Sequence, residues 1–100
     1  MNLLEFHSRL SSPIHERVLQ FPENLMIYTM LNGAAINEND LTQITHEGSK
    51  VRLKFISDDA AKNAEDKIAA QVVPGICGGP LYGIVAIQEK ESLVVEFVEL

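Results

Sequence analysis

Lys50-Val51-Arg52-Leu53-Lys54-Phe55-Ile56 carries the clearest strand signal in this chain. Apolar and basic side chains alternate along it with a period of two, and successive side chains of a strand point to opposite faces of a sheet. We therefore predict a strand with one face toward a core and a basic face away from it. The core-facing residues are Val51, Leu53 and Phe55, and the basic residues are Lys50, Arg52 and Lys54.

The residues after this strand predict a helix. Ser57 is expected to be its N-cap, and Asp58 and Asp59 follow in the first turn, where the helix dipole favours negative charge. Small and aliphatic residues recur at helical spacing and predict an apolar stripe that packs on a sheet. The stripe consists of Ala61, Ala64, Ile68 and Val72. Pro74 is expected to end the helix.

The C-terminal residues predict two strands, 83–88 and 92–99, joined by a turn at 89–91. The second of them is apolar on both faces. Leu93, Val95 and Phe97 share one face, and Val94 and Val98 share the other. A strand with two apolar faces is typical of the interior of a sheet or of a subunit interface.

The N-terminal half is less regular. Residues 2–8 are predicted to be a strand, and residues 12–21 fit either a helix that starts at Ser11-Ser12-Pro13 or the second arm of a hairpin with residues 2–10. Residues 25–31 are rich in strand formers and are predicted to be a buried strand that ends at the turn Asn32-Gly33. Residues 37–47 are predicted to be a short helix, capped by Asn37 and ended by Gly48 in a left-handed conformation.

These elements predict a single small α+β domain over residues 1–100, because a chain of 100 residues builds one core. The order strand, helix, strand, strand, helix, strand is that of a ferredoxin-like βαββαβ sandwich. Here the short helix 37–47 and the C-terminal strand would be additions to that pattern.

Composition restricts the classes of partner and the compartment. The formal charge of −6, from 14 acidic and 8 basic residues, disfavours binding to a nucleic-acid backbone. The N-terminus lacks the basic and apolar regions of a secretory signal, and no apolar run is long enough for a membrane span. A single cysteine cannot form an internal disulfide, so we expect a cytoplasmic protein with no membrane partner.

The stretch Pro74 to Gly83 holds four of the six glycines, two of the four prolines and the only cysteine. Phosphate-binding loops run from a strand into a helix N-terminus, but this loop is expected to run from a helix into a strand, which argues against phosphate. We interpret it as a glycine-shaped corner that presents side chains to a partner or ligand. Its candidate binding residues are Gly75, Cys77, Gly78, Gly79 and Tyr82.

No residue pattern predicts catalysis, a metal site or a cofactor. A nucleophilic cysteine needs a nearby base, and nothing in the sequence places His7, His15 or His46 next to Cys77. The histidines and the cysteine also lack the spacing of metal ligands. Lys50, Arg52 and Lys54 are candidates for weak anion binding, with cross-strand pairing to Glu96 or Glu99 as the alternative.

We expect a small, non-catalytic interaction module that self-associates or docks on a larger protein, because segments with two apolar faces need covering. The alternative is a small-molecule-binding protein or enzyme, in which Cys77, Tyr82 and a histidine converge on a cleft. Nucleic-acid binding by the Lys50–Lys54 face is the weakest hypothesis, given the net charge.

Overall fold

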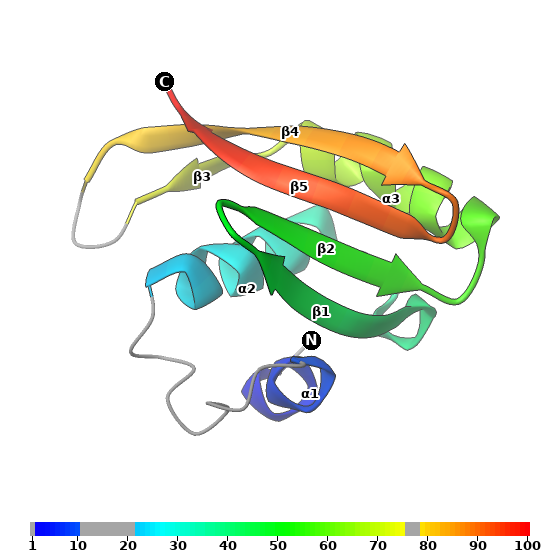
Figure 1. Ribbon diagram of the computed structural model, residues 1–100. Coiled ribbons are helices and arrows are strands. Elements are labelled where there is room, and N and C mark those ends of the chain that lie inside the picture. Colours follow the sequence, from blue (N-terminus) through cyan, green and yellow to red (C-terminus); the bar gives the residue numbers. More distant parts are fainter. Residues whose placement is uncertain (1, 11–21, 76–78) are drawn as a thin grey trace.

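The computed structural model describes residues 2–10, 22–75 and 79–100. In these residues one antiparallel sheet of five strands has helices packed behind it in the view of Figure 1. The α+β class and the single domain are therefore as expected. The elements are α1 (Leu3–Arg9), α2 (Pro22–Ala34), the 3₁₀ helix η2 (Glu38–Asp40), β1 (Leu41–Glu47), β2 (Lys50–Phe55), α3 (Asp58–Ala69), β3 (Val72–Pro74), β4 (Leu81–Glu89) and β5 (Ser92–Glu99).

The strand and helix predicted from residues 50–69 are confirmed. The apolar side chains of β2 are buried, and the N-cap of α3 is Ser57, whose Oγ accepts a hydrogen bond from the Ala60 N–H at 3.1 Å. The α3 residues that face the core are Ala61, Ala64 and Ile68. The predicted end of the helix is wrong. Helix α3 stops at Ala69, and both Val72 and Pro74 belong to strand β3.

The strands lie in the order β1-β2-β5-β4-β3, and neighbouring strands are antiparallel. Hairpins join β1 to β2, β3 to β4 and β4 to β5, while α3 carries the chain from β2 to the far edge at β3. The last strand, β5, lies at the centre of the sheet. This confirms the prediction from its two apolar faces, since a central strand has neighbours on both edges and packs side chains on both sides.

The strand predicted for residues 2–8 is wrong, because most of these residues lie in helix α1. A reciprocal capping arrangement holds its first turn. The Glu5 N–H donates to Asn2 Oδ1 at 2.9 Å, and the Asn2 N–H donates to Glu5 Oε2 at 3.3 Å. A cap residue followed three positions later by glutamate signals the start of a helix, and the strand prediction did not take this signal into account.

Residues 25–31 are also helical rather than extended, and Asn32-Gly33 lies in the last turn of α2 instead of a hairpin. The buried side chains recur at helical spacing, at Met26, Ile27, Met30, Leu31 and Ala34. Helix α2 packs its apolar side against the sheet, α3 and α1, while Thr29 and Asn32 lie exposed on its other side. On the α1 side, the rings of Tyr28 and Phe6 pack in a T-shaped arrangement with their centroids 5.5 Å apart.

The helix predicted for residues 37–47 is wrong over most of its length. Asn37 is a cap, accepting from the Asn39 N–H at 3.0 Å, but it caps the single turn of η2, after which β1 begins. Pairing of Ile44 with Leu53 on β2 outweighs the local helical marks. Gly48 is left-handed as predicted, with φ +66°, but in the turn between β1 and β2.

Because two of the expected strands are helices, the ferredoxin-like order of elements is not confirmed. The two alternatives for residues 12–21 lie outside the described residues.

Arg9 joins α1 to the start of β1. Its guanidinium donates to the carbonyl oxygens of Leu41 at 2.7 Å and Glu38 at 2.8 Å, and also to Glu5 at 2.9 Å. Next to it, Leu10 forms an isolated bridge with Ile44 on the outer edge of the sheet. These contacts occupy part of an edge that would otherwise be open to another strand.

Candidate functional site

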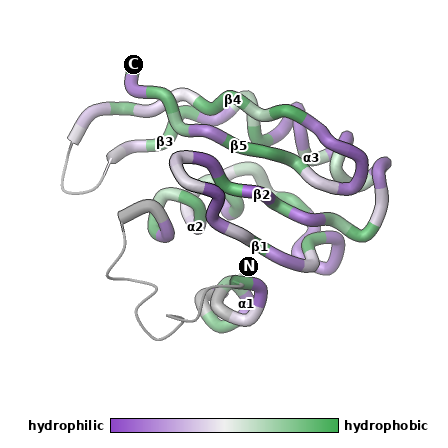
Figure 2. The backbone as a smooth tube through the Cα atoms, in the orientation of Figure 1, coloured by the Kyte–Doolittle hydropathy of each residue, from purple (hydrophilic) through white to green (hydrophobic). Residues whose placement is uncertain are grey.

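The two faces of the sheet differ in what covers them. On the inner face α2 and α3 pass behind the strands (Figure 1), and the inward side chains of β2 and β5 are buried. On the other face the outward side chains of β3, β4 and β5 include aliphatic residues that are between 41% and 57% exposed. Figure 2 shows hydrophobic stretches along β4 and β5. We call Val72, Leu81, Val85, Ile87 and Val98 the apolar patch; Val94, on the same face of β5, is buried.

The register of the strands brings the patch together. Gly83 on β4 lies between Val72 on β3 and Val98 on β5, and Ile87 lies opposite Val94. A hollow of about 70 Å³ beside Val85 and Ile87 is also lined by Val94 and by the charged residues Lys50 and Glu96. The patch therefore extends over three adjacent strands. Sequence reasoning found its β5 part through the two apolar faces of 93–98, but did not foresee the contributions of β3 and β4.

Charged side chains occupy the β1 and β2 part of the same face. The Arg52 Nε donates to Glu47 Oε2 at 2.7 Å, and its Nη2 lies 3.3 Å from Glu89 Oε1. Glu96 is opposite Lys50 in the register, whereas Glu99 pairs with β4. Arg52 is therefore paired with carboxylates, as the alternative to anion binding predicted, but its partners are Glu47 and Glu89 instead of Glu96 or Glu99. Between described residues, no carboxylate lies within 4.0 Å of the Lys50 or Lys54 ammonium.

The hydrogen bond from Arg52 holds the pKa of Glu47 below its ordinary value of 4.5, and Glu47 in turn raises the pKa of Arg52. A carboxylate whose pKa is lower in the folded state stabilises the protein at pH values above its unfolded-state pKa. This contribution is lost as the pH falls through the folded-state pKa.

We therefore expect Glu47→Gln to lower the melting temperature at pH 7 by a few degrees at most, because the pair is exposed. The difference from the unmodified chain should disappear below the folded pKa of Glu47, which lies under 4.5. Thermal denaturation at a series of pH values measures this, with Glu99→Gln as a control for loss of one charge. A difference that stays constant down to acid pH would contradict the ion-pair explanation.

The glycine-rich loop connects two strands, β3 and β4, in an antiparallel hairpin. The expectation that it follows a helix C-terminus is wrong, so the dipole argument drawn from that position does not apply. The Gly75 N–H donates to the Pro80 carbonyl at 2.9 Å. A Cβ at Gly75 would lie 2.8 Å from that oxygen and 3.2 Å from Tyr82 Cε2, so this position requires glycine.

The other predicted loop residues are placed unevenly. Gly79 is exposed, and Cys77 and Gly78 lie outside the described residues. Tyr82 is half-buried on the inner face of β4, packed against Gly75. The structure therefore brings Gly75 and Tyr82 together.

Tyr82 also lines a cavity of about 340 Å³ at the end of the sheet near the β1–β2 turn. His46 is on its wall, so Tyr82 and one histidine line the same cavity, while Cys77, which the alternative hypothesis also required, lies outside the described residues. The His46 Nε2 is 2.7 Å from Oδ1 of the buried Asn24. The lining residues are Met26, His46, Gly48, Ser49, Lys50, Val51, Tyr82 and Phe97.

Most of this lining was not foreseen. Met26 comes from α2, which was expected to be a strand, and Phe97 was assigned only to a core face. Asn24 carried no signal beyond its position two residues after Pro22.

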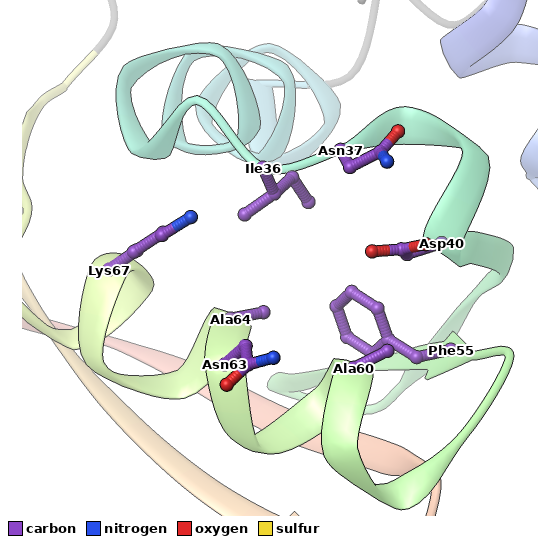
Figure 3. A pocket seen from close by; sticks show the side chains of 8 residues that line it. All are labelled: Ile36, Asn37, Asp40, Phe55, Ala60, Asn63, Ala64 and Lys67. Atoms are coloured by element: carbon purple, nitrogen blue, oxygen red, sulfur yellow. The ribbon is translucent and has the colours of Figure 1, made fainter.

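A smaller cavity of about 130 Å³ lies between α3 and the segment around η2 (Figure 3). Asp40 and Lys67 approach it from different elements, with Asn63 on α3 between them. Its floor is the buried Phe55 ring. A space of this size suits water or a ligand of very few atoms.

Within the described residues, no group of three or more histidine, cysteine, aspartate or glutamate side chains is arranged to hold a metal ion. None of the described helices combines the length and apolar character that crossing a bilayer requires. We found no match to this chain among protein-family models, curated proteins or solved structures.

Proposed function

We propose that this chain is a non-catalytic interaction module that forms a homodimer through the apolar patch. The observation that carries the proposal is the exposure of aliphatic side chains on three adjacent strands, with no covering layer formed by the described residues. Contiguous apolar surface of this kind marks interaction sites in soluble proteins. The single cysteine favours a reducing compartment for this dimer, such as the cytoplasm.

A second copy of the chain fits the register of the patch. β4 is the middle strand of the three, with β5 on one side and β3 on the other. A two-fold axis parallel to β4 would place β4 on β4 and β5 on β3 of the other copy. Because Val72 and Val98 are level with Gly83, each would meet the other across the interface. Stacked sheets cross at about −30°, so these contacts are closest near the axis.

The basic residues of β2 on the same face agree with this placement. The basic residues lie on β2, two strands from β4, whereas the sheet ends at β3, one strand from β4 on the other side. The sheet of the second copy would therefore stop short of β2 and leave Arg52 and Glu47 in solvent, so their pairing carries no cost of burial. Two carboxylates lie on the strands that it does cover, Glu96 on β5 and Glu89 at the end of β4, and each must keep its contact with solvent at the rim of the interface.

Sedimentation velocity or light scattering over a range of concentrations tests the proposal. The mass should rise from the 11.1 kDa of one chain toward twice that value. A patch of three short strands is at the low end of interface sizes, so we expect a dissociation constant on the order of micromolar. Added sodium chloride should leave association unchanged, because the contact is apolar. A mass of one chain up to millimolar concentration would overturn the homodimer.

A further inference from the structure

We infer that the cavity of about 340 Å³ at the end of the sheet binds an uncharged two-ring aromatic molecule that carries one N–H or O–H donor. The cavity lies on the inner face of the sheet. His46 is level with the buried Val51, and Tyr82 is level with the buried Val73, so both side chains point away from the apolar patch. Binding there is therefore a property additional to self-association.

Apolar side chains form most of the cavity wall. Met26 of α2 and Val51 of β2 are buried, and Tyr82 and Phe97 are half-buried diagonal neighbours on β4 and β5. Since a dry cavity of about 150 Å³ holds benzene, a cavity of about 340 Å³ has room for a two-ring aromatic. Such a molecule would contact two rings and a thioether, and both kinds of group pack favourably on aromatic surfaces.

The charges around the cavity do not select an ion. Lys50 is a lining residue, but it alternates with Val51 and is level with Glu96, so its side chain points to the outer face. Among the described residues that line the cavity there is no aspartate or glutamate, and Glu99, level with Tyr82, is exposed and outside the lining. A charged ligand would lose hydration here without gaining an ion pair, so an uncharged one is favoured.

The imidazole of His46 provides an acceptor that is already oriented. Its Nε2 is 2.7 Å from Oδ1 of the buried Asn24, and this oxygen can only accept, so Nε2 carries the proton. In the neutral imidazole Nδ1 is then an acceptor, and it has no hydrogen-bond partner among the described residues. Because the bond to Asn24 orders the ring beforehand, a ligand N–H or O–H can bond to Nδ1 at little cost in entropy.

NMR titration of the ¹⁵N-labelled chain with indole tests this inference. Indole should shift the amide signals of the β1–β2 turn and of Tyr82 and Phe97, with a dissociation constant of about a millimolar for so small a ligand. 1-Methylindole, whose ring nitrogen carries no proton, should bind about fivefold more weakly. Indole-3-acetate and tryptamine, which add a negative and a positive charge, should bind no more tightly than indole.

Two variants locate the acceptor and separate this site from the dimer contact. His46→Leu keeps an apolar side chain but removes the acceptor, so it should bind indole and 1-methylindole equally. Ile87→Glu, on the outer face, should bind indole as the unmodified chain does, whether or not that chain dimerises.

A preference for indole over 1-methylindole that is absent from the unmodified chain, or that persists in His46→Leu, would overturn the inference. Tighter binding of either charged probe, loss of binding in Ile87→Glu, or shifts confined to the apolar patch would also overturn it. So would the absence of shifts near the solubility limit of indole.

Discussion

Replacement of Ile87 with glutamate is expected to abolish self-association at concentrations where the unmodified chain is dimeric. Ile87 is 57% exposed and points outward from β4, the strand on which the proposed axis lies. In a two-fold interface each substitution occurs twice, and a residue on the axis faces its own copy. Two carboxylates would meet in an apolar contact, and we expect the dissociation constant to rise at least about 100-fold.

The fold should tolerate this change, because surface substitutions away from special features usually alter stability by about 0.5 kcal/mol or less. Ile56→Glu is the matched control. Ile56 is 61% exposed but lies between β2 and α3, outside the patch. It should leave the mass distribution in sedimentation velocity unchanged. Loss of association in both variants, or in neither, would contradict the patch as the interface.

A mixing experiment tests the position of the axis. Ile87→Glu and Ile87→Lys should each be monomeric alone, and an equimolar mixture should recover association. Recovery requires that residue 87 of one copy lies near residue 87 of the other. If the mixture stays monomeric although the unmodified chain dimerises, the two-fold axis does not run along β4.

Replacement of Gly75 with valine is expected to cause the largest loss of stability among the loop variants. The Cβ would lie 2.8 Å from the Pro80 carbonyl oxygen, which belongs to the backbone of the same hairpin and also accepts the Gly75 N–H. The hairpin must open or Tyr82 must move. We expect about 2–3 kcal/mol lower stability, or a melting temperature lower by about 10–20 °C.

Gly33→Ala is the control for adding a Cβ to a glycine with a close neighbour. The nearest atom there is Gln71 Oε1 at 2.5 Å, the end of a flexible side chain that can turn away. Because Gly33 lies in α2, alanine should stabilise the chain by up to about 1 kcal/mol. Thermal denaturation monitored by circular dichroism measures both variants. If Gly75→Val has the same melting temperature as the unmodified chain, the loop can adjust to a Cβ at this position without loss of stability.

The elements predicted correctly are those whose local signals agree with one another. β2 has strict alternation, α3 has a serine cap, an acidic first turn and an apolar stripe, and β5 has two apolar faces. In each, the local preference and the final packing favour the same conformation. Such agreement is what makes a segment predictable from sequence.

The incorrect predictions share a cause. Residues 25–31 are apolar on all sides, and a short run of this kind fits a buried strand and a buried helix equally well. The segment became a helix because its apolar side packs on α1, α3 and the sheet, with Thr29 left exposed. Residues 41–47 are the reverse case. Their sequence has helical features, but antiparallel pairing with β2 makes them a strand.

The sequence alone determined the α+β class, restricted the last strand to the interior of a sheet or an interface, and indicated that the 74–83 loop needs glycine, as Gly75 does, because periodicity, capping and backbone sterics act over a few residues. Only the tertiary structure decided which surfaces meet. Two successive hairpins put Val72 and Val98 on either side of Gly83, and the packing of α2 brought Met26 to Tyr82 and His46. Those contacts depend on segments far apart in the chain, and no local pattern encodes them.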